Sequence, residues 1–433
     1  MKYRFYLGLW GWLSAAAVPG LRAEDSLSWF EDRVSIGGEI RGRGELYGNF
    51  YTPDGRSDKE DEFFLLRTKL HLDVHPDESW RIFIEGQDSR EFGSDWNSRR
   101  TVPNAMEDDL DLFQAYLDLR RIADAPLSLR AGRQLLAFGK QRLVGGFLWS
   151  NVARSFDALL LNLDWPSTVQ GNIDLFIGKP VIHDWGNFND IFHNDDLFYG
   201  VYTTWKSVPG MDFLEAYYLA RDNDERRDHV HTLGVRAGRA YDNRWDWEIE
   251  LAGQAGEFTD LDHTAFAAHA EAGYTLDPAW KPRVSLGYSY ATGDEDPRDG
   301  GHETFDNLFP TNHIHYGYMD LFSWRNVHDV ELEFSALPVE RLKVLFEAHG
   351  FFLPEPDSDA WYNAGGGILR RAAAGRDARP YVGAELDFMA TWRIHDQFTL
   401  EAGYSHFFAG DYVQDTGGSD DADWGYLQGA FTF

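Results

Sequence analysis

The chain has 433 residues, no cysteine and a formal net charge of −31 at pH 7. The lack of cysteine excludes a disulfide framework, a thiolate nucleophile and a zinc–thiolate site. The acidic balance argues against nucleic-acid binding, which needs clustered Lys and Arg. Aromatic residues make up 15% of the chain beside 26% charged residues. A membrane barrel uses such rings as girdles at both interfaces, so the composition favours that class over a water-soluble core.

The first 23 residues are predicted to be a cleaved secretory signal peptide. Lys2 and Arg4 give a basic start, residues 5–18 are apolar, and Ala23 offers a small residue at the cut. The alternative is a membrane anchor, but the apolar segment is too short to span a bilayer as a helix. We therefore expect residues 24–433 to form the mature protein as one domain.

Beyond this segment, apolar and polar residues alternate with a period of two. Phe64, Leu66 and Leu70 alternate with Arg67 and Lys69 in one such stretch. The pattern is typical of a strand with one apolar and one polar face, and it does not fit a helix. Tilted strands of roughly ten residues cross a bilayer, which fits these segments. The predicted strands are 34–48, 63–75, 78–89, 109–120, 127–138, 155–165, 170–178, 197–206, 211–222, 230–240, 244–256, 263–277, 281–292, 327–336, 341–352, 381–394, 397–407 and 423–433.

Short and long connections between these strands alternate along most of the chain. The short turns are 75–77, 166–168, 207–210, 241–243, 277–279, 337–339 and 395–396. The long loops are 90–108, 139–154, 179–196, 293–326, 353–380 and 408–422. Short periplasmic turns and long extracellular loops are typical of outer-membrane barrels. The sequence therefore predicts an all-β fold, a single 18-stranded antiparallel transmembrane β-barrel.

Three clusters of residues resemble the alginate-export family of outer-membrane porins. The first is LRAGRQ at 129–134 with QRLVG at 141–145 and WSNVARSFD at 149–157. The second is ATGD at 291–294 with ETFDNLFPTNH at 303–313 and YGYMDLFSWRN at 316–326. The third is GAELD at 383–387 with GYS at 403–405 and GDY at 410–412. The resemblance implies an 18-stranded monomeric barrel for passive export of an uncharged-to-anionic polysaccharide, with lumen arginines that hold uronate carboxylates and loops that gate the pore.

Eight arginines are candidates for guiding carboxylates through the lumen. A guanidinium binds a carboxylate through paired hydrogen bonds, and several weak sites let a polymer move from one to the next. The candidates are Arg67, Arg81 and Arg130 by strand phase, Arg133, Arg142 and Arg154 in the motif region, and Arg325 and Arg393 as weaker additions. Loop 139–154 is expected to fold into the lumen as a constriction. The alternative is that these arginines only neutralise lumen acids.

The predicted lumen face also carries many acids. They are Asp246, Glu248, Glu250, Asp329, Glu331 and Glu333, with Glu385 and Asp387 nearer the C-terminus. Acids and arginines on opposite sides would give the pore a transverse field, whereas dominant acids would favour a cationic or neutral permeant. A general or carboxylate-uptake porin therefore remains the alternative function.

No catalytic site, cofactor or metal is predicted. The histidines His263, His269, His302, His313 and His315 accompany no recognisable nucleophile motif. The acidic loop 294–299 lacks the spacing of an EF-hand, so calcium binding there stays open. The expected partners are outer-membrane lipids, a polysaccharide or small anionic solute and, from the terminal Phe433, the barrel-assembly machinery. A non-transporting barrel that acts as an adhesin or enzyme is the third hypothesis.

Overall fold

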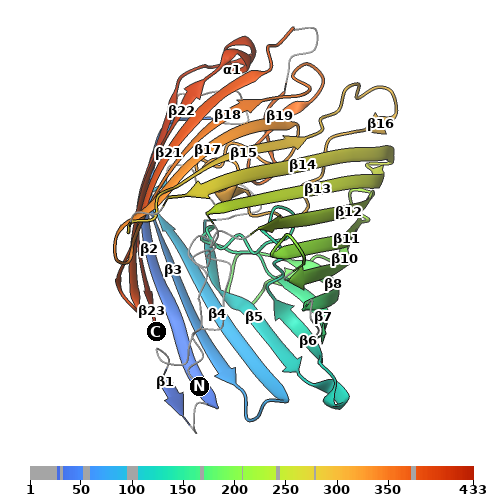
Figure 1. The fold of residues 1–433 in the computed structure, drawn as a ribbon, viewed down its shortest axis with the longest axis vertical. Helices are drawn as coiled ribbons and strands as arrows, with labels where there is room; N and C mark the ends of the chain where they lie inside the picture. Colours follow the sequence, from blue (N-terminus) through green and yellow to red (C-terminus); the bar gives the residue numbers. More distant parts are fainter. Residues whose placement is uncertain are drawn as a thin grey trace.

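The protein forms a closed antiparallel barrel of 18 strands in the computed structural model (Figure 1). The structure describes residues 27–29, 33–51, 59–94, 106–165, 170–206, 208–239, 244–276, 279–371 and 377–433. The predicted signal peptide lies outside these residues. The ring closes where β23 pairs with β2, and Phe433 and Gly38 exchange backbone hydrogen bonds of 2.9 and 3.1 Å.

The barrel strands follow one another around the ring in chain order. They are β2 (Val34–Phe50), β3 (Lys59–Val74), β4 (Trp80–Phe92), β5 (Asp108–Leu119), β6 (Leu127–Gln134), β7 (Phe156–Trp165), β8 (Gly171–Ile182), β10 (Asp196–Lys206), β11 (Phe213–Asn223), β12 (Asp228–Arg239), β13 (Trp245–Phe258), β14 (Leu261–Thr275), β15 (Arg283–Ala291), β17 (Val327–Val339), β18 (Leu342–Phe352), β21 (Tyr381–His395), β22 (Phe398–Ala409) and β23 (Ala422–Thr432).

Small elements accompany the barrel. They are β1 (Leu27–Trp29), β9 (Ile191–Phe192), β16 (Gly301–His302), the hairpin of β19 (Ala360–Tyr362) and β20 (Ile368–Arg371), the 3-10 turns η3 (Ile122–Asp124) and η4 (Asn312–Ile314), and α1 (Asp411–Thr416). Within the described residues, no helix is long and apolar enough to cross a membrane.

The predicted strands are confirmed, and their ends differ where tertiary contacts intervene. The strand predicted over 127–138 ends at Gln134, because Leu136 enters the apolar core formed by the inner loops. The turn predicted at 337–339 begins later, since β17 continues to Val339. A bulge in its pairing with β18 lies between Ala336 and Val339 and absorbs the extra length.

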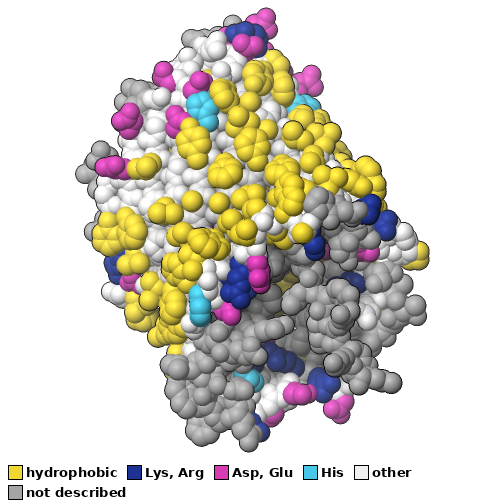
Figure 2. Space-filling view, turned by 60° about the vertical axis from the view of Figure 1, so that its left-hand side comes forward, with side chains coloured by type: hydrophobic (Ala, Val, Ile, Leu, Met, Phe, Trp, Pro, Cys, Tyr) yellow, Lys and Arg dark blue, Asp and Glu magenta, His cyan; other side chains and the backbone are white. Residues whose placement is uncertain are grey.

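The outer wall is apolar because side chains of alternate residues point outward along each strand. In β15, Leu286 is 60% exposed whereas Ser285 and Ser289 are buried. Figure 2 shows a broad band of apolar side chains over one face, with charged side chains above and below it. This arrangement matches a wall in contact with lipid tails.

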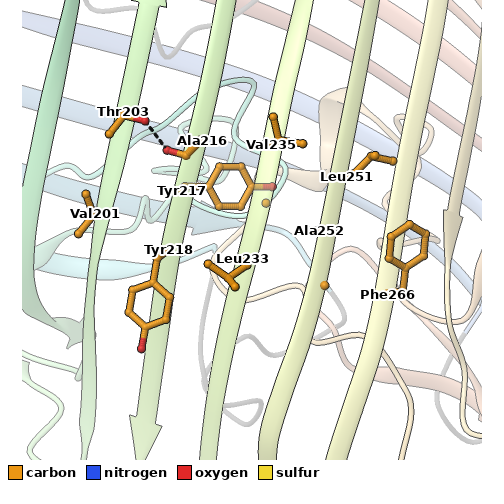
Figure 3. A pocket seen from close by; sticks show the side chains of 12 residues that line it. Val201, Thr203, Ala216, Tyr217, Tyr218, Leu233, Val235, Leu251, Ala252 and Phe266 are labelled. Carbon is orange, nitrogen blue, oxygen red and sulfur yellow. Dashed lines mark hydrogen bonds between the residues drawn. The ribbon is translucent and has the colours of Figure 1, made fainter.

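A shallow groove crosses the outer wall over β10 to β14 (Figure 3). Its lining includes Val201, Leu233 and Phe266, and Leu233 is 66% exposed. The Thr203 hydroxyl donates to the Ala216 carbonyl at 2.8 Å, so this polar group has a partner in apolar surroundings. The groove belongs to the lipid-facing surface and lies outside the lumen.

Leu286→Arg tests the assignment of the outer wall. An arginine on the lipid-facing side costs about 2–4 kcal/mol near the bilayer midplane. We expect the free energy of unfolding, measured by urea titration in lipid vesicles, to fall by about this amount. Phe188→Arg is the control, because Phe188 is 69% exposed in a loop outside the strands. Equal stability of the two variants would contradict the assignment.

Candidate permeation pathway

The loop 135–155 crosses the lumen from one wall to the opposite wall. At one end, Arg142 Nη1 donates to Glu248 Oε1 at 2.6 Å and to Glu250 Oε2 at 2.9 Å on β13. At the other end, the loop meets β2 and β3. The strand pairings place β13 opposite β3 in the ring. The segment that the sequence predicted as a constriction, 139–154, thus divides the interior of the barrel.

Three buried arginines on β2 and β3 hold the far end of this loop. Arg67 Nη1 donates to the carbonyls of Leu148 and Ser150, at 2.8 Å each. Arg41 donates to the same two carbonyls at 3.0 and 3.1 Å. Arg43 donates to the Trp149 carbonyl at 2.8 Å and stacks 3.8 Å from the centre of its ring. Charged donors give strong hydrogen bonds, so this wall fixes the position of the loop.

Arg41 and Arg43 were not among the predicted site residues. Both lie in the predicted strand 34–48, on the face that alternates with its apolar residues. Their register opposite β3 places Arg41 directly across from Arg67, which the sequence did select. The three arginines share one face of their strands, and this shared phase could have identified Arg41 and Arg43 from the sequence. Nothing in the sequence marks the backbone carbonyls that they bind.

Segments 303–326 and 353–371 join the first loop to form an apolar core inside the barrel. Gly145 N donates to the Phe309 carbonyl at 2.8 Å, and Thr311 N donates to the Gln141 carbonyl at 2.9 Å. The Trp361 indole donates to the Leu321 carbonyl at 2.8 Å. Fully buried residues of this core are Phe305, Tyr316, Phe322, Trp324 and Trp361. These loops therefore narrow the lumen.

Arg154 and Arg325 belong to this loop assembly. Arg154 Nη1 donates to the carbonyls of Gly145 at 2.9 Å and Pro310 at 3.1 Å. Burial, with a contribution from Arg221, lowers the pKa of Arg154 to about 10, so it stays charged at neutral pH. Arg325 lies 4.7 Å from the centre of the Tyr362 ring. Both arginines connect one loop to another.

Arg81 and Arg130 lie toward the short-turn end and remain partly exposed. Arg81 forms a bidentate pair with Asp73 at 2.7 and 2.8 Å. Arg130 forms one with Asp118 at 2.6 and 3.1 Å, and it lies 4.2 Å from the centre of the Tyr116 ring. Their side chains are 21% and 31% exposed. Arg81 also lies 4.0 Å from Asp118, so this carboxylate faces both guanidiniums while each keeps access to solvent.

Stacked rings support these two arginines. The rings of His71 and Phe83 stack with centres 5.2 Å apart, and those of Phe83 and Tyr116 stack at 5.3 Å. Arg81 lies 5.0 Å from the centre of the Phe83 ring. Cation–π contacts of this kind hold a guanidinium plane in a fixed orientation.

The candidates Arg133 and Arg393 lie at two other places in the barrel. Arg133 pairs with Asp157 at 2.9 and 3.0 Å on the outward face, the face that Leu159 shares. The register of β6 with both of its neighbours is continuous, so Arg130 and Arg133, three residues apart, point to opposite faces of the strand. Arg393 lies beside the turn between β21 and β22, 3.5 Å from Asp396.

The lumen acids Asp246, Glu248 and Glu250 on β13 and Glu333 on β17 are paired with arginines. Arg283 binds Asp246 at 2.5 Å and Glu333 at 2.8 Å, and it also contacts Glu271. Arg236 bridges Glu215 at 2.7 Å and Glu248 at 2.6 Å. Acids and arginines therefore occur together on both sides of the lumen, because Asp73 and Asp118 bind Arg81 and Arg130 on the other side.

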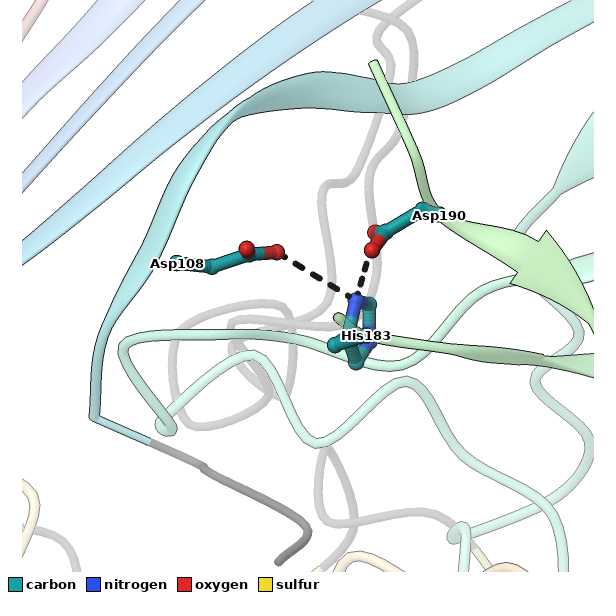
Figure 4. A group of neighbouring side chains, drawn as sticks. All are labelled: Asp108, His183 and Asp190. Carbon is teal, nitrogen blue, oxygen red and sulfur yellow. Dashed lines mark hydrogen bonds and ion pairs between the residues drawn. The ribbon is translucent and has the colours of Figure 1, made fainter. Parts of the chain in front are cut away.

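Two further acidic groups lie in the loops. In Figure 4, His183 Nδ1 faces both Asp190 Oδ2 at 2.8 Å and Asp108 Oδ2 at 3.6 Å. In loop 294–299, Asp299 accepts from Gly301 N at 2.7 Å, and Asp296 accepts from Arg298 at 3.0 Å. These bonds fix the local turns of each loop.

The barrel, its apolar outer band and the inner loops define a porin-type outer-membrane channel. Solved structures with this fold include three from Pseudomonas aeruginosa. OpdQ has a TM-score of 0.60 at 10% identity, over 92% of this chain and 97% of that chain. OpdL has a TM-score of 0.60 at 11% identity, over 92% and 98%. OccD3 (OpdP) has a TM-score of 0.58 at 12% identity, over 95% and 93%.

The chain belongs to the alginate-export family, whose profile, described as alginate export, matches residues 32–426. This confirms the resemblance seen in the sequence. The protein is therefore an outer-membrane channel. No curated protein sequence matches the chain.

Proposed function

We propose that this channel passes an anionic polysaccharide or oligosaccharide along its arginine-bearing wall. The carrying observation is the pair Arg81 and Arg130, which are partly exposed and held in place by stacked rings and by the carboxylates of Asp73 and Asp118. A uronate carboxylate can share these guanidiniums with Asp73 and Asp118. Such shared binding is weak at each position, as movement of a polymer requires.

The opposite wall offers a polyanion no comparable pair of accessible arginines. The arginines there, Arg142, Arg236 and Arg283, are buried, and each binds at least two carboxylates. The inner loop 135–155 divides the space between the two walls. The solute path then runs along β2 to β6, past Arg81 and Arg130.

Replacing both arginines tests the proposal. In planar bilayers, we expect R81Q/R130Q channels to need about tenfold more polyuronate for half-block of the current, which corresponds to about 1.4 kcal/mol of lost binding. Arg121→Gln is the control, since Arg121 lies at the same end of the barrel with a 73% exposed side chain. Unchanged block in R81Q/R130Q would refute the assignment.

A carboxylate-uptake porin is the second candidate. It is favoured by the pairing of Arg67 with Glu39 and of Arg142 with Glu248 and Glu250, which leaves a lumen of mixed charge. A small carboxylate would pass this lumen by diffusion alone. Permeation of small carboxylates into liposomes, with no block by polyuronate, would support this candidate over the first.

We further propose how the chain is processed, assembled and active. A signal peptide over 1–23 is removed after export, the barrel-assembly machinery recognises the last strand at Phe433, and the channel works as a monomer without catalytic activity. The porin-type fold and the family support these statements. The mass of the purified protein checks the first of them, because it should correspond to a start at Glu24.

A further inference from the structure

The lumen wall formed by β17, β18 and β21 gathers acids around one histidine. The acids are Asp329, Glu331, Glu333, Glu347, Glu385 and Asp387, and the histidine is His349. Asp329, Glu385 and Asp387 are 0% exposed, and His349 is 3% exposed. Buried carboxylates at this density need a counter-charge. Arg283 supplies one at Glu333, at the edge of the group.

His349 is oriented like a metal-binding imidazole. Its Nδ1 donates to Asp329 Oδ1 at 3.0 Å. A carboxylate on one ring nitrogen fixes the tautomer and leaves the lone pair of the other nitrogen for a cation. That other nitrogen, Nε2, is buried and has no hydrogen-bond partner among the described residues. It lies 3.7 Å from Glu347 Oε2.

Three carboxylate oxygens without partners lie on the same wall. Asp387 Oδ2, Glu385 Oε2 and Asp329 Oδ2 are buried, and within the described chain none has a hydrogen-bond partner. Their sister oxygens are occupied, since Asp387 accepts from the Ser405 hydroxyl and Glu385 accepts from Met319 N at 2.8 Å. An unsatisfied buried acceptor costs free energy, which a bound cation would recover.

We propose that Glu347, His349 and Asp387 bind a divalent cation of the zinc class. The ligand atoms of these three residues lie within 4.8 Å of one another. Zinc takes imidazole nitrogen and carboxylate oxygen at about 2.0–2.2 Å, so the three groups reach one ion after small inward shifts. The mixed N and O ligands favour zinc over calcium, which prefers oxygen alone. Asp329 is the positioning residue, and Glu385 lies beside the site as the strand partner of His349.

The group of Asp108, His183 and Asp190 in Figure 4 differs from the proposed zinc site. There, one ring nitrogen of His183 faces both carboxylates, and Asp190 Oδ1 accepts from Asp184 N at 3.0 Å. That arrangement is a hydrogen-bonded loop contact. At His349, Asp329 binds Nδ1 and Glu347 lies toward Nε2. Asp387 has a ligand atom within 4.8 Å of those of Glu347 and His349.

The ion would also attach an inner loop to the barrel wall. Met319 belongs to loop 303–326, and its backbone binds Glu385 beside the site. A cation there neutralises the acids beneath this loop. We therefore expect added zinc to raise the melting temperature of the purified channel as well as to bind it.

The experiment measures zinc bound to the full-length barrel in detergent. The protein is stripped with EDTA, dialysed against Zn²⁺ and analysed by elemental mass spectrometry. We expect one zinc per chain in the wild type and none in His349→Gln or Asp387→Asn. His269→Gln should keep its zinc, because His269 is a buried lumen histidine whose Nδ1 contacts Ser289 rather than a carboxylate.

X-ray absorption of the zinc-loaded wild type gives a readout that needs no variant. A shell of one imidazole and several oxygens supports the site, and a shell without imidazole overturns it. A wild type that binds no more zinc than His349→Gln also overturns it, since the carboxyl groups would then hold protons instead. Zinc stoichiometry is independent of polyuronate block, so this proposal and the proposed function can fail separately.

Discussion

Channels that carry Arg41→Gln together with Arg67→Gln are expected to conduct more current and to fluctuate more than the wild type. The two side chains give four charged hydrogen bonds to the carbonyls of Leu148 and Ser150. Each such bond contributes about 1.5–3 kcal/mol, so their loss weakens the docking of the inner loop by several kcal/mol. Single-channel recording in planar bilayers measures the result directly.

Arg90→Gln is the matched control for this double variant. Arg90 is also a strand arginine, but it pairs with Asp88 at 2.5 Å and with Asp109 instead of with the inner loop. Its conductance should equal that of the wild type. If R41Q/R67Q channels show the same conductance and noise as Arg90→Gln channels, the loop does not depend on the β2–β3 wall.

Arg283→Gln is expected to cause the largest loss of stability of any single substitution considered for this barrel. Arg283 is 1% exposed and neutralises Asp246, Glu271 and Glu333. Removing one partner of a buried ion pair costs about 3–5 kcal/mol, because it leaves charges without compensation. Urea unfolding in lipid vesicles, or loss of the heat-modifiable band on gels, measures the effect.

Two further variants separate charge from packing at Arg283. Arg298→Gln removes an exposed arginine whose side chain is 87% accessible, and it should leave stability unchanged. Adding Asp246→Asn and Glu333→Gln to Arg283→Gln should restore much of the loss, since fewer charges are then left unpaired. Equal stability of the single and triple variants would show that packing of the Arg283 side chain dominates.

The fold could be predicted from the sequence because barrel strands follow a local rule. Alternation with a period of two marks each strand, and the unequal connections mark the two ends of the barrel. The sequence does not show where a strand ends when long-range contacts decide its end. Leu136 continues the apolar pattern of β6 yet belongs to the inner core, and β17 passes the expected turn by means of a bulge.

For the permeation pathway, the sequence could predict only which side chains point into the lumen. Strand phase selected Arg67, Arg81 and Arg130, but it could not show that Arg67 binds loop carbonyls whereas Arg81 and Arg130 stay partly exposed. Those partners lie far away in the sequence. Arg133 was selected from the motif region, and its spacing of three residues from Arg130 on the same strand places it on the outward face.

The acidic wall illustrates a similar limit. The sequence placed Asp329, Glu331 and Glu333 on one face but predicted no metal. The groups that meet there come from three strands, and His349 and Asp387 become neighbours only through the register of β18 with β21. Pairing across strands, rather than spacing along one strand, creates this constellation.

Reversal potential and polyuronate block, measured on the wild-type channel in planar bilayers, test the central claim most directly. We expect discrete conductance steps, no strong preference for cations, and a block that deepens with polyuronate concentration and depends on the sign of the voltage. A barrel without conductance steps would contradict the assignment as a channel. Strong cation preference together with no block by polyuronate would contradict the passage of an anionic polymer.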